Sequence, residues 1–191
     1  MERLFVAIDI SDSQVADALK RIACGAPNVD WTAPENLHLT LAFIGDPPQP
    51  VRQTARLFEA IAVEPFTASL SGVEAYDLGN GYSALCARVE KTAELMSLQC
   101  QCVAVLARTE ADLKGRSYRP HVTLGLVESK NLHKSRPWLK RHERFQAECF
   151  VSAFHLYASH RIGRFVELTR IRRYSVSGVS LTPPKTNSET L

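Results

Sequence analysis

Two short stretches of the chain alternate between apolar and polar residues in the same order. Residues 36–43 read Asn-Leu-His-Leu-Thr-Leu-Ala-Phe, and residues 121–126 read His-Val-Thr-Leu-Gly-Leu. Alternation of this kind predicts half-buried β-strands, whose successive side chains point to opposite faces. His38 and Thr40 would then share one face, His121 and Thr123 would share another, and leucine or valine would lie behind each pair. A single His-x-Thr is most simply a polar strand face, but two copies in matching apolar frames indicate a functional site.

The remaining hydrophobic pattern predicts a chain in which strands and helices alternate but neighbouring strands form hairpins. A glycine-rich turn at residues 79–81 is a strong hairpin signal, and a second turn is expected at Gly163. Antiparallel hairpins of this kind favour an α+β fold over a doubly wound parallel sheet. We expect strands at residues 3–8, 29–32, 66–78, 82–89, 150–158 and 164–176, and helices beginning near Ser11 and covering residues 51–62 and 92–108.

The repeat suggests two similar halves. The two histidines are too far apart for a solenoid repeat of roughly 20–50 residues. Two half-domains that face each other would bring both His-x-Thr faces to one cleft. We therefore expect residues 1–177 to form a single bilobal domain. Residues 178–191, with Pro183-Pro184 and a Ser/Thr/Asn-rich end, are expected to be a flexible C-terminal tail.

Composition and charge narrow the class of protein. The chain has 191 residues, 45% of them hydrophobic and 23% charged. No apolar run approaches the ~20 residues of a membrane span, and the N-terminal apolar stretch is too short for a secretory signal, so a cytoplasmic protein is expected. The five cysteines form no CxxC pair and are expected to be buried thiols. Acidic residues dominate positions 1–95 and basic residues dominate 96–191, which suggests a polyanionic partner.

Two imidazoles and two hydroxyls form a set with definite chemistry. One imidazole can act as a general base while the other acts as a general acid. The hydroxyls can donate hydrogen bonds to a tetrahedral anionic centre, above all a phosphate. A metal site would need three or four ligands, and neither motif has a carboxylate within its strand. We therefore expect no metal and no cofactor.

Several segments resemble one family, the LigT-like RNA 2′,3′-cyclic phosphodiesterases, also called 2′-5′ RNA ligases, of the 2H phosphoesterase superfamily. The similar segments are residues 3–8, 31–45, 119–124, 156–159 and 163–168. The resemblance implies two antiparallel sheets with flanking helices that face each other across a central cleft, related by a pseudo-twofold repeat.

The resemblance also implies hydrolysis of RNA-terminal 2′,3′-cyclic phosphate to a 2′-phosphomonoester, with 2′-5′ ligation as the reverse type of reaction. It assigns catalysis to His38, Thr40, His121 and Thr123, with His38 as the acid and His121 activating water. The alternatives are a 2′-5′ oligonucleotide or small cyclic-nucleotide phosphodiesterase, and a non-catalytic module that binds RNA ends. The expected partner is an RNA end, and the protein is expected to be a monomer with no membrane association.

A phosphate transition state at this site would also need a positive charge nearby. Members of the family often carry an arginine five residues after the second histidine, where this chain has Leu126. Arg119 lies two residues before His121, so alternation would place it on the same face as a substrate-binding residue. Pro120 weakens that argument, and the alternative is a side chain in solvent. The basic stretch 130–144, with Arg170, Arg172 and Arg173, would hold RNA backbone or form a solvated face.

Overall fold

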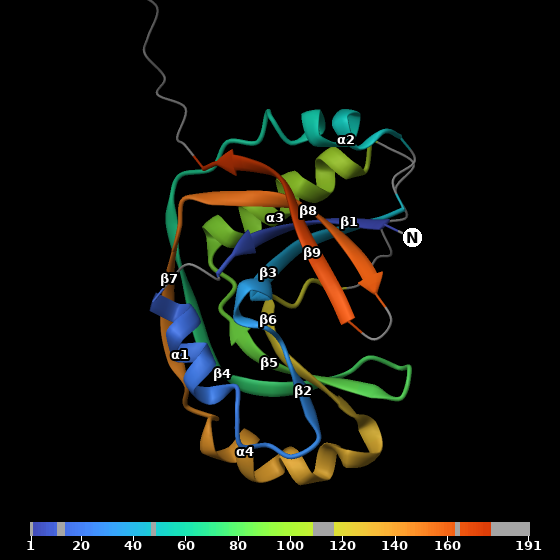
Figure 1. Ribbon diagram of the computed structural model, residues 1–191. Coiled ribbons are helices and arrows are strands. Elements are labelled where there is room, and N and C mark those ends of the chain that lie inside the picture. Colours follow the sequence, from blue (N-terminus) through green and yellow to red (C-terminus); the bar gives the residue numbers. More distant parts are fainter. Residues whose placement is uncertain (1, 11–13, 47–48, 109–116, 163–164, 177–191) are drawn as a thin grey trace, which may run out of the picture.

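The structure is a computed structural model that describes residues 2–10, 14–46, 49–108, 117–162 and 165–176. It confirms the α+β class, with a large antiparallel sheet and helices outside it (Figure 1). The strands are β1 (Glu2–Asp9), β2 (Val29–Trp31), β3 (His38–Gly45), β4 (Phe66–Asp77), β5 (Tyr82–Val89), β6 (His121–Glu128), β7 (Gln146–Val151), β8 (Ala153–Ile162) and β9 (Phe165–Ser175). The helices are α1 (Gln14–Ile22), α2 (Val51–Leu57), α3 (Ala93–Leu106) and α4 (Arg136–Arg141), with 3₁₀ turns η1 (Pro34–Asn36) and η2 (Ser129–Ser135).

The strands follow one hydrogen-bonded path, in the order β7-β4-β5-β6-β3-β1-β8-β9, and β2 also pairs with β6. The two expected sheets are therefore joined rather than separate. β3 and β6 connect the halves of this path through a single pair, Leu39 with Val122. We call β3, β1, β8 and β9 the first half-sheet, and β6, β5, β4 and β7 the second half-sheet. β3 and β6 pair only near the first residue of each strand. Beyond that point the two half-sheets diverge from each other.

Two helices, α1 and α3, each contact the half-sheet that does not contain the strand directly before them. Helix α1 follows β1 of the first half-sheet but contacts β7 of the second, whereas α3 follows β5 of the second and contacts β3 of the first. Figure 1 shows α2 and α3 over the first half-sheet, and α4 at the far end of the second. Trp138 ties α4 to α1, because its indole N–H donates to the Ile22 carbonyl at 2.8 Å. The exchange is limited to α1 and α3, and α3 also contacts β4 of the second half-sheet.

The chain crosses between the half-sheets at Ser152. The expected strand 150–158 is in fact two strands, because β7 ends at Val151 and pairs with β4, whereas β8 begins at Ala153 and pairs with β1. No glycine or proline marks the crossing in the sequence, which is why an apolar run was expected to form one strand. The expected hairpin of the last two strands is present as β8 and β9, while its turn at Gly163 lies outside the described residues, as do Ser11 and the proposed tail 178–191.

Burial of the two motif strands follows the alternation. Leu37, Leu39 and Leu41 are 3%, 0% and 2% exposed, and Val122 and Leu124 are fully buried. The cysteines only partly agree with expectation: three are buried, but Cys24 and Cys100 are exposed. In the part of the chain that the structure describes, no helix is long and apolar enough to cross a membrane.

Candidate active site

The junction of the two half-sheets gathers the predicted site residues. Leu39 and Val122 point into the core, so the residues on either side of them point to the opposite face. These residues are the four motif side chains His38, Thr40, His121 and Thr123, each of which is half-buried. The junction therefore unites two polar pairs that lie far apart in the sequence.

The two motif strands share a finer irregularity. Along both β3 and β6 the burial pattern from histidine to strand end is the same. Each strand also has a register shift directly after its threonine, so that Leu41 and Leu124 are extra residues opposite β1 and β5. Such bulges re-aim the side chains that flank them and are common beside active sites.

Each histidine side chain contacts a backbone carbonyl two residues earlier in the chain. Nδ1 of His38 lies 2.7 Å from the Asn36 carbonyl oxygen, and Nδ1 of His121 lies 2.7 Å from the Arg119 carbonyl oxygen. Because a carbonyl only accepts hydrogen bonds, each Nδ1 carries the proton and donates it. Each Nε2 is then the ring nitrogen left to accept a proton.

His38 lies in a partly apolar setting. Its ring is 5.0 Å from that of Phe5, and its backbone pairs with that of Asp9 on β1. Burial lowers the pKa of His38 from its ordinary value, while the Asn36 carbonyl and Asp9 raise it and the charge of His121 lowers it further. The influence of His121 on this pKa shows that the two imidazoles interact electrostatically.

His121 has different neighbours. The ring of Tyr76 lies 5.1 Å from it, and the Tyr76 hydroxyl donates to the Glu74 carboxylate. Burial, followed by Glu74, raises the pKa of Tyr76, so this hydroxyl stays protonated. Thr123 lies 3.9 Å from the Cys86 sulfur, whose pKa burial raises to about 12. Cys86 is therefore a neutral neighbour of Thr123 and not a nucleophile.

Arg119 lies two residues before the start of β6. Its side chain is exposed, yet its charge is among the influences that lower the pKa of Tyr76. Arg119 and Tyr76 therefore interact electrostatically. Its contact with a substrate stays a prediction. Leu126 is 40% exposed and Phe43, at the equivalent position of β3, is 72% exposed.

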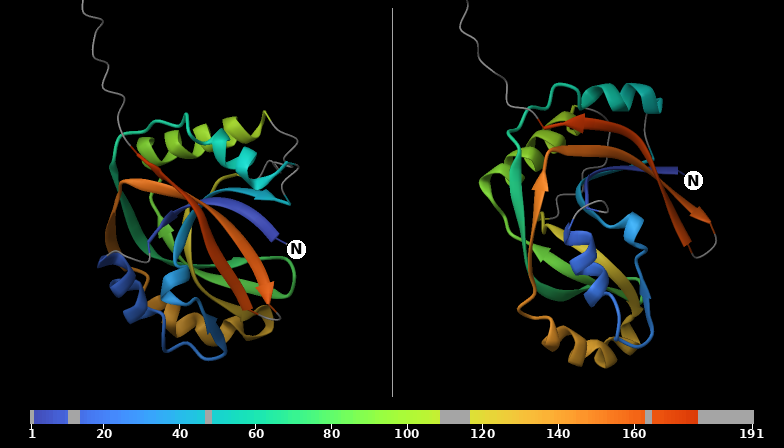
Figure 2. Two further views of the ribbon diagram at one scale, coloured as in Figure 1. Left: turned by 45° about the horizontal axis from the view of Figure 1, so that its top comes forward. Right: turned by 60° about the vertical axis from the view of Figure 1, so that its left-hand side comes forward.

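The expected basic surface is divided in the structure. Residues 130–141 form η2 and α4 at one end of the molecule, and β9 lies in the other half-sheet (Figures 1 and 2). Arg172 pairs with Glu59 near α2 at 2.7 Å, whereas Arg170 pairs with Asp9 beside His38. The cations therefore do not form a single surface.

Sequence reasoning missed the residues that surround the histidines. Asp9, Tyr76 and Tyr157 come from three strands outside the motifs, and Tyr157 stacks on Phe5 with ring centroids 5.2 Å apart. The spacing of these residues in the sequence carries no signal, because only strand pairing brings them to the site. Across the described ranges, no three His, Cys, Asp or Glu side chains gather in an arrangement that could hold a metal ion.

The chain matches the family model of the 2′-5′ RNA ligase superfamily over residues 11–163. A curated protein named RNA 2′,3′-cyclic phosphodiesterase, from Archaeoglobus fulgidus, is 32% identical over 135 residues, which is 68% of this chain and 74% of that protein. The chain therefore belongs to the 2′-5′ RNA ligase superfamily, as the resemblance implied.

Solved structures show the same fold. The Thermus thermophilus protein TT0787 has a TM-score of 0.73 at 22% identity, covering 93% of this chain and 99% of that one. LigT of E. coli, solved in complex with NADP+, has a TM-score of 0.71 at 23% identity, covering 92% and 98%. Its complex with 3′-AMP gives a TM-score of 0.68 at 22% identity, with the same coverage of 92% and 98%.

Proposed function

We propose that the protein hydrolyses RNA-terminal 2′,3′-cyclic phosphate to a 2′-phosphomonoester at the four motif residues. The observation that carries the proposal is the matched pair of histidines, each held through Nδ1 by a carbonyl two residues earlier and each able to exchange a proton at Nε2. The name of the Archaeoglobus fulgidus relative and the nucleotide complexes of LigT support the same class of substrate.

The proposed reaction is one displacement at phosphorus. Nε2 of His121 accepts a proton from water as the water oxygen bonds to phosphorus. The bond from phosphorus to the 3′ oxygen breaks, and Nε2 of His38 donates its proton to that oxygen. Thr40 and Thr123 donate hydrogen bonds to the non-bridging oxygens, where negative charge gathers in the transition state. If a 5′-hydroxyl takes the place of water, the same displacement forms a 2′-5′ linkage.

The proposal includes metal independence. The two protons are moved by imidazoles, and the charge on the phosphate is met by two hydroxyls with Arg119 as the proposed cation. No step of this reaction needs a metal-bound hydroxide. Turnover should therefore survive an excess of chelator, and loss on chelation with recovery by one divalent ion would contradict this part of the proposal.

A panel of defined phosphodiester ends tests the function. An RNA oligomer with a 2′,3′-cyclic phosphate end should give the 2′-phosphate as the only product, identified by chromatography against 2′- and 3′-phosphate standards. Faster cleavage of a 2′-5′ linked oligonucleotide would favour that activity instead. Salt-sensitive binding of the RNA without turnover of any substrate would indicate that the protein is a non-catalytic module that binds RNA ends.

A further inference from the structure

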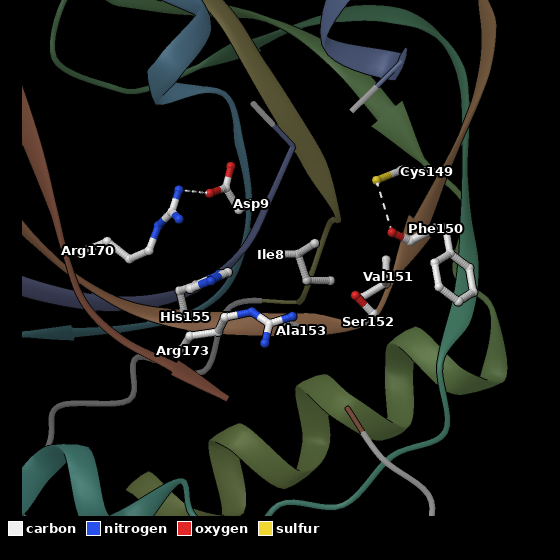
Figure 3. A pocket seen from close by; sticks show the side chains of 10 residues that line it. All are labelled: Ile8, Asp9, Cys149, Phe150, Val151, Ser152, Ala153, His155, Arg170 and Arg173. Atoms are coloured by element: carbon white, nitrogen blue, oxygen red, sulfur yellow. Dashed lines mark hydrogen bonds and ion pairs between the residues drawn. The ribbon is translucent and has the colours of Figure 1, made fainter. Parts of the chain in front are cut away.

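A pocket whose lining includes two arginines lies at the crossing from β7 to β8. A cavity of about 210 Å³ opens there, and its polar lining comes from Asp9, Ser152, His155, Arg170 and Arg173. We call it the crossover pocket. Figure 3 shows His155 between the two arginines, with Ser152 on the opposite side of the pocket.

His155 is the unusual member of this lining. It is 5% exposed, and its Nδ1 finds no hydrogen-bond partner among the described residues. Burial lowers the pKa of His155, and the charges of Arg170 and Arg173 lower it too, while Asp9 raises it. Buried polar atoms in proteins are nearly always paired, so a buried ring nitrogen without a partner at the wall of a cavity points to a bound group.

The two arginines have different roles. Arg170 forms an ion pair with Asp9, which neutralises the carboxylate of the pocket lining. Arg173 is exposed and donates from Nη1 to the Ser175 hydroxyl at 3.3 Å. A guanidinium has five N–H donors, so most of those of Arg173 remain for a ligand. The lining is therefore net cationic, and its donors suit an oxyanion.

Strand register relates this pocket to the active site. Thr40 pairs with Ala7, Ala7 pairs with His155, and His155 pairs with Arg173. Directly paired residues share a face of the sheet, so Thr40, His155 and Arg173 lie in one row on the face of the motif residues. Three strand spacings separate the backbones at the ends of the row, roughly 14 Å. The pocket itself reaches closer to the motif residues, because Asp9, the backbone partner of His38, lines it together with Arg173.

We propose that the crossover pocket binds the phosphodiester on the 5′ side of the terminal nucleotide, an inference that rests on the proposed hydrolysis of RNA ends. Arg173 donates to the non-bridging oxygens, and the Nδ1 hydrogen of His155 and the Ser152 hydroxyl complete the contacts. The pocket would thereby distinguish an RNA end from a free cyclic nucleotide.

The test compares two substrates and two matched variants. A nucleoside 2′,3′-cyclic phosphate lacks the second phosphate, whereas a dinucleotide with the same cyclic end has it. Arg173→Gln should lower kcat/KM for the dinucleotide by about tenfold or more, since charge-assisted hydrogen bonds are lost. The same variant should leave kcat/KM for the nucleoside substrate unchanged. Arg172→Gln is the control, because Arg172 is adjacent in the chain but pairs with Glu59.

A 5′-phosphorylated nucleoside cyclic phosphate separates two sources of the anion. One outcome is that Arg173→Gln lowers kcat/KM for this substrate as much as for the dinucleotide. In that case the pocket accepts any phosphate at that position, and the restriction to a phosphodiester is overturned. Equal losses on both original substrates, or equal losses in the Arg172 variant, would overturn the pocket itself.

Product binding keeps the inference separate from the proposed function. A dinucleotide that ends in a 2′-phosphate should bind the wild-type protein more tightly than Arg173→Gln, and the slope of log affinity against log salt should fall by about one phosphate contact in the variant. A binding difference without turnover would contradict the proposed function alone. Unchanged binding and slope would contradict the pocket alone.

Discussion

The two half-sheets present the same pair of side chains in unequal surroundings. On the first half-sheet, His38 is flanked by Phe5 and Asp9, and burial lowers its pKa. On the second half-sheet, His121 is flanked by Tyr76, whose hydroxyl donates a hydrogen bond to the Glu74 carboxylate. The hydrogen bond at Nδ1 is the same for both histidines, so the backbone repeat sets their orientation. The two histidines therefore share one backbone hydrogen bond but lie among different side chains.

The comparison extends to the position four residues after each histidine. It is Ala42 on β3 and Gly125 on β6, and both are buried. A Cβ on Gly125 would lie 2.9 Å from the Asp30 carbonyl oxygen and 2.7 Å from the Val29 side chain, because β2 runs alongside β6. The second half-sheet therefore admits no side chain at a position where the first has one.

The largest expected effect tests whether the histidines act as one unit. His38→Ala and His121→Ala should each slow turnover of a cyclic-phosphate end by on the order of 10³-fold, because each removes a proton-transfer partner. The double variant should be little slower than either, since groups that act together are strongly non-additive. Single-turnover rates on an RNA oligomer measure this. Near-normal turnover in either single variant would end the assignment of an acid–base pair.

The glycine difference predicts an effect on stability. Gly125→Ala should lower the free energy of unfolding by about 1–3 kcal/mol, because the methyl group overlaps the backbone of β2. Urea unfolding monitored by circular dichroism measures the change. A matched control is Ala42→Gly, which removes a methyl group without overlap and should cost about 1 kcal/mol. If Gly125→Ala were neutral, close packing of β2 would not explain the asymmetry.

Because position 126 is leucine, Arg119 is the proposed source of positive charge for the substrate phosphate. Arg119→Ala should lower kcat/KM by about tenfold, a loss expected of a charged hydrogen-bond donor to phosphate. Arg119→Lys should recover only part of it, because lysine lacks the bidentate fork. Leu126→Arg in the Arg119→Ala background should also restore part of the rate, since position 126 is exposed. An unchanged rate in the alanine variant would show that Arg119 does not contact the substrate.

The smallest expected effect is a shift in pH dependence, and its direction identifies the acid. If His38 is the acid, kcat/KM falls as pH rises through its lowered pKa, below the ordinary value of about 6.5. Asp9→Asn removes an influence that raises this pKa, so the fall should move to still lower pH. If His38 is instead the base, the same variant would extend activity toward acid. The pH profile of kcat/KM for both proteins decides between these roles.

Local pattern predicted much of this protein. Alternation around His38 and His121 was sufficient to place both motifs on strands and to assign their leucines to the core. The hairpin at residues 79–81 and the helix 92–108 were likewise local, and they are present as β4–β5 and α3. These features depend on side-chain direction and turn chemistry within a few residues, which a sequence displays directly.

Tertiary structure alone decided what surrounds the histidines. The crossing at Ser152, the exchange of α1 and α3, and the row from Thr40 to Arg173 all depend on which strands pair. Register determines which side chains from distant segments share a face, and a shift of one residue would reverse every face. The two His-x-Thr strands could therefore be predicted from the sequence, whereas Asp9, Tyr76 and the crossover pocket become neighbours of these strands only through the pairing of the folded sheet.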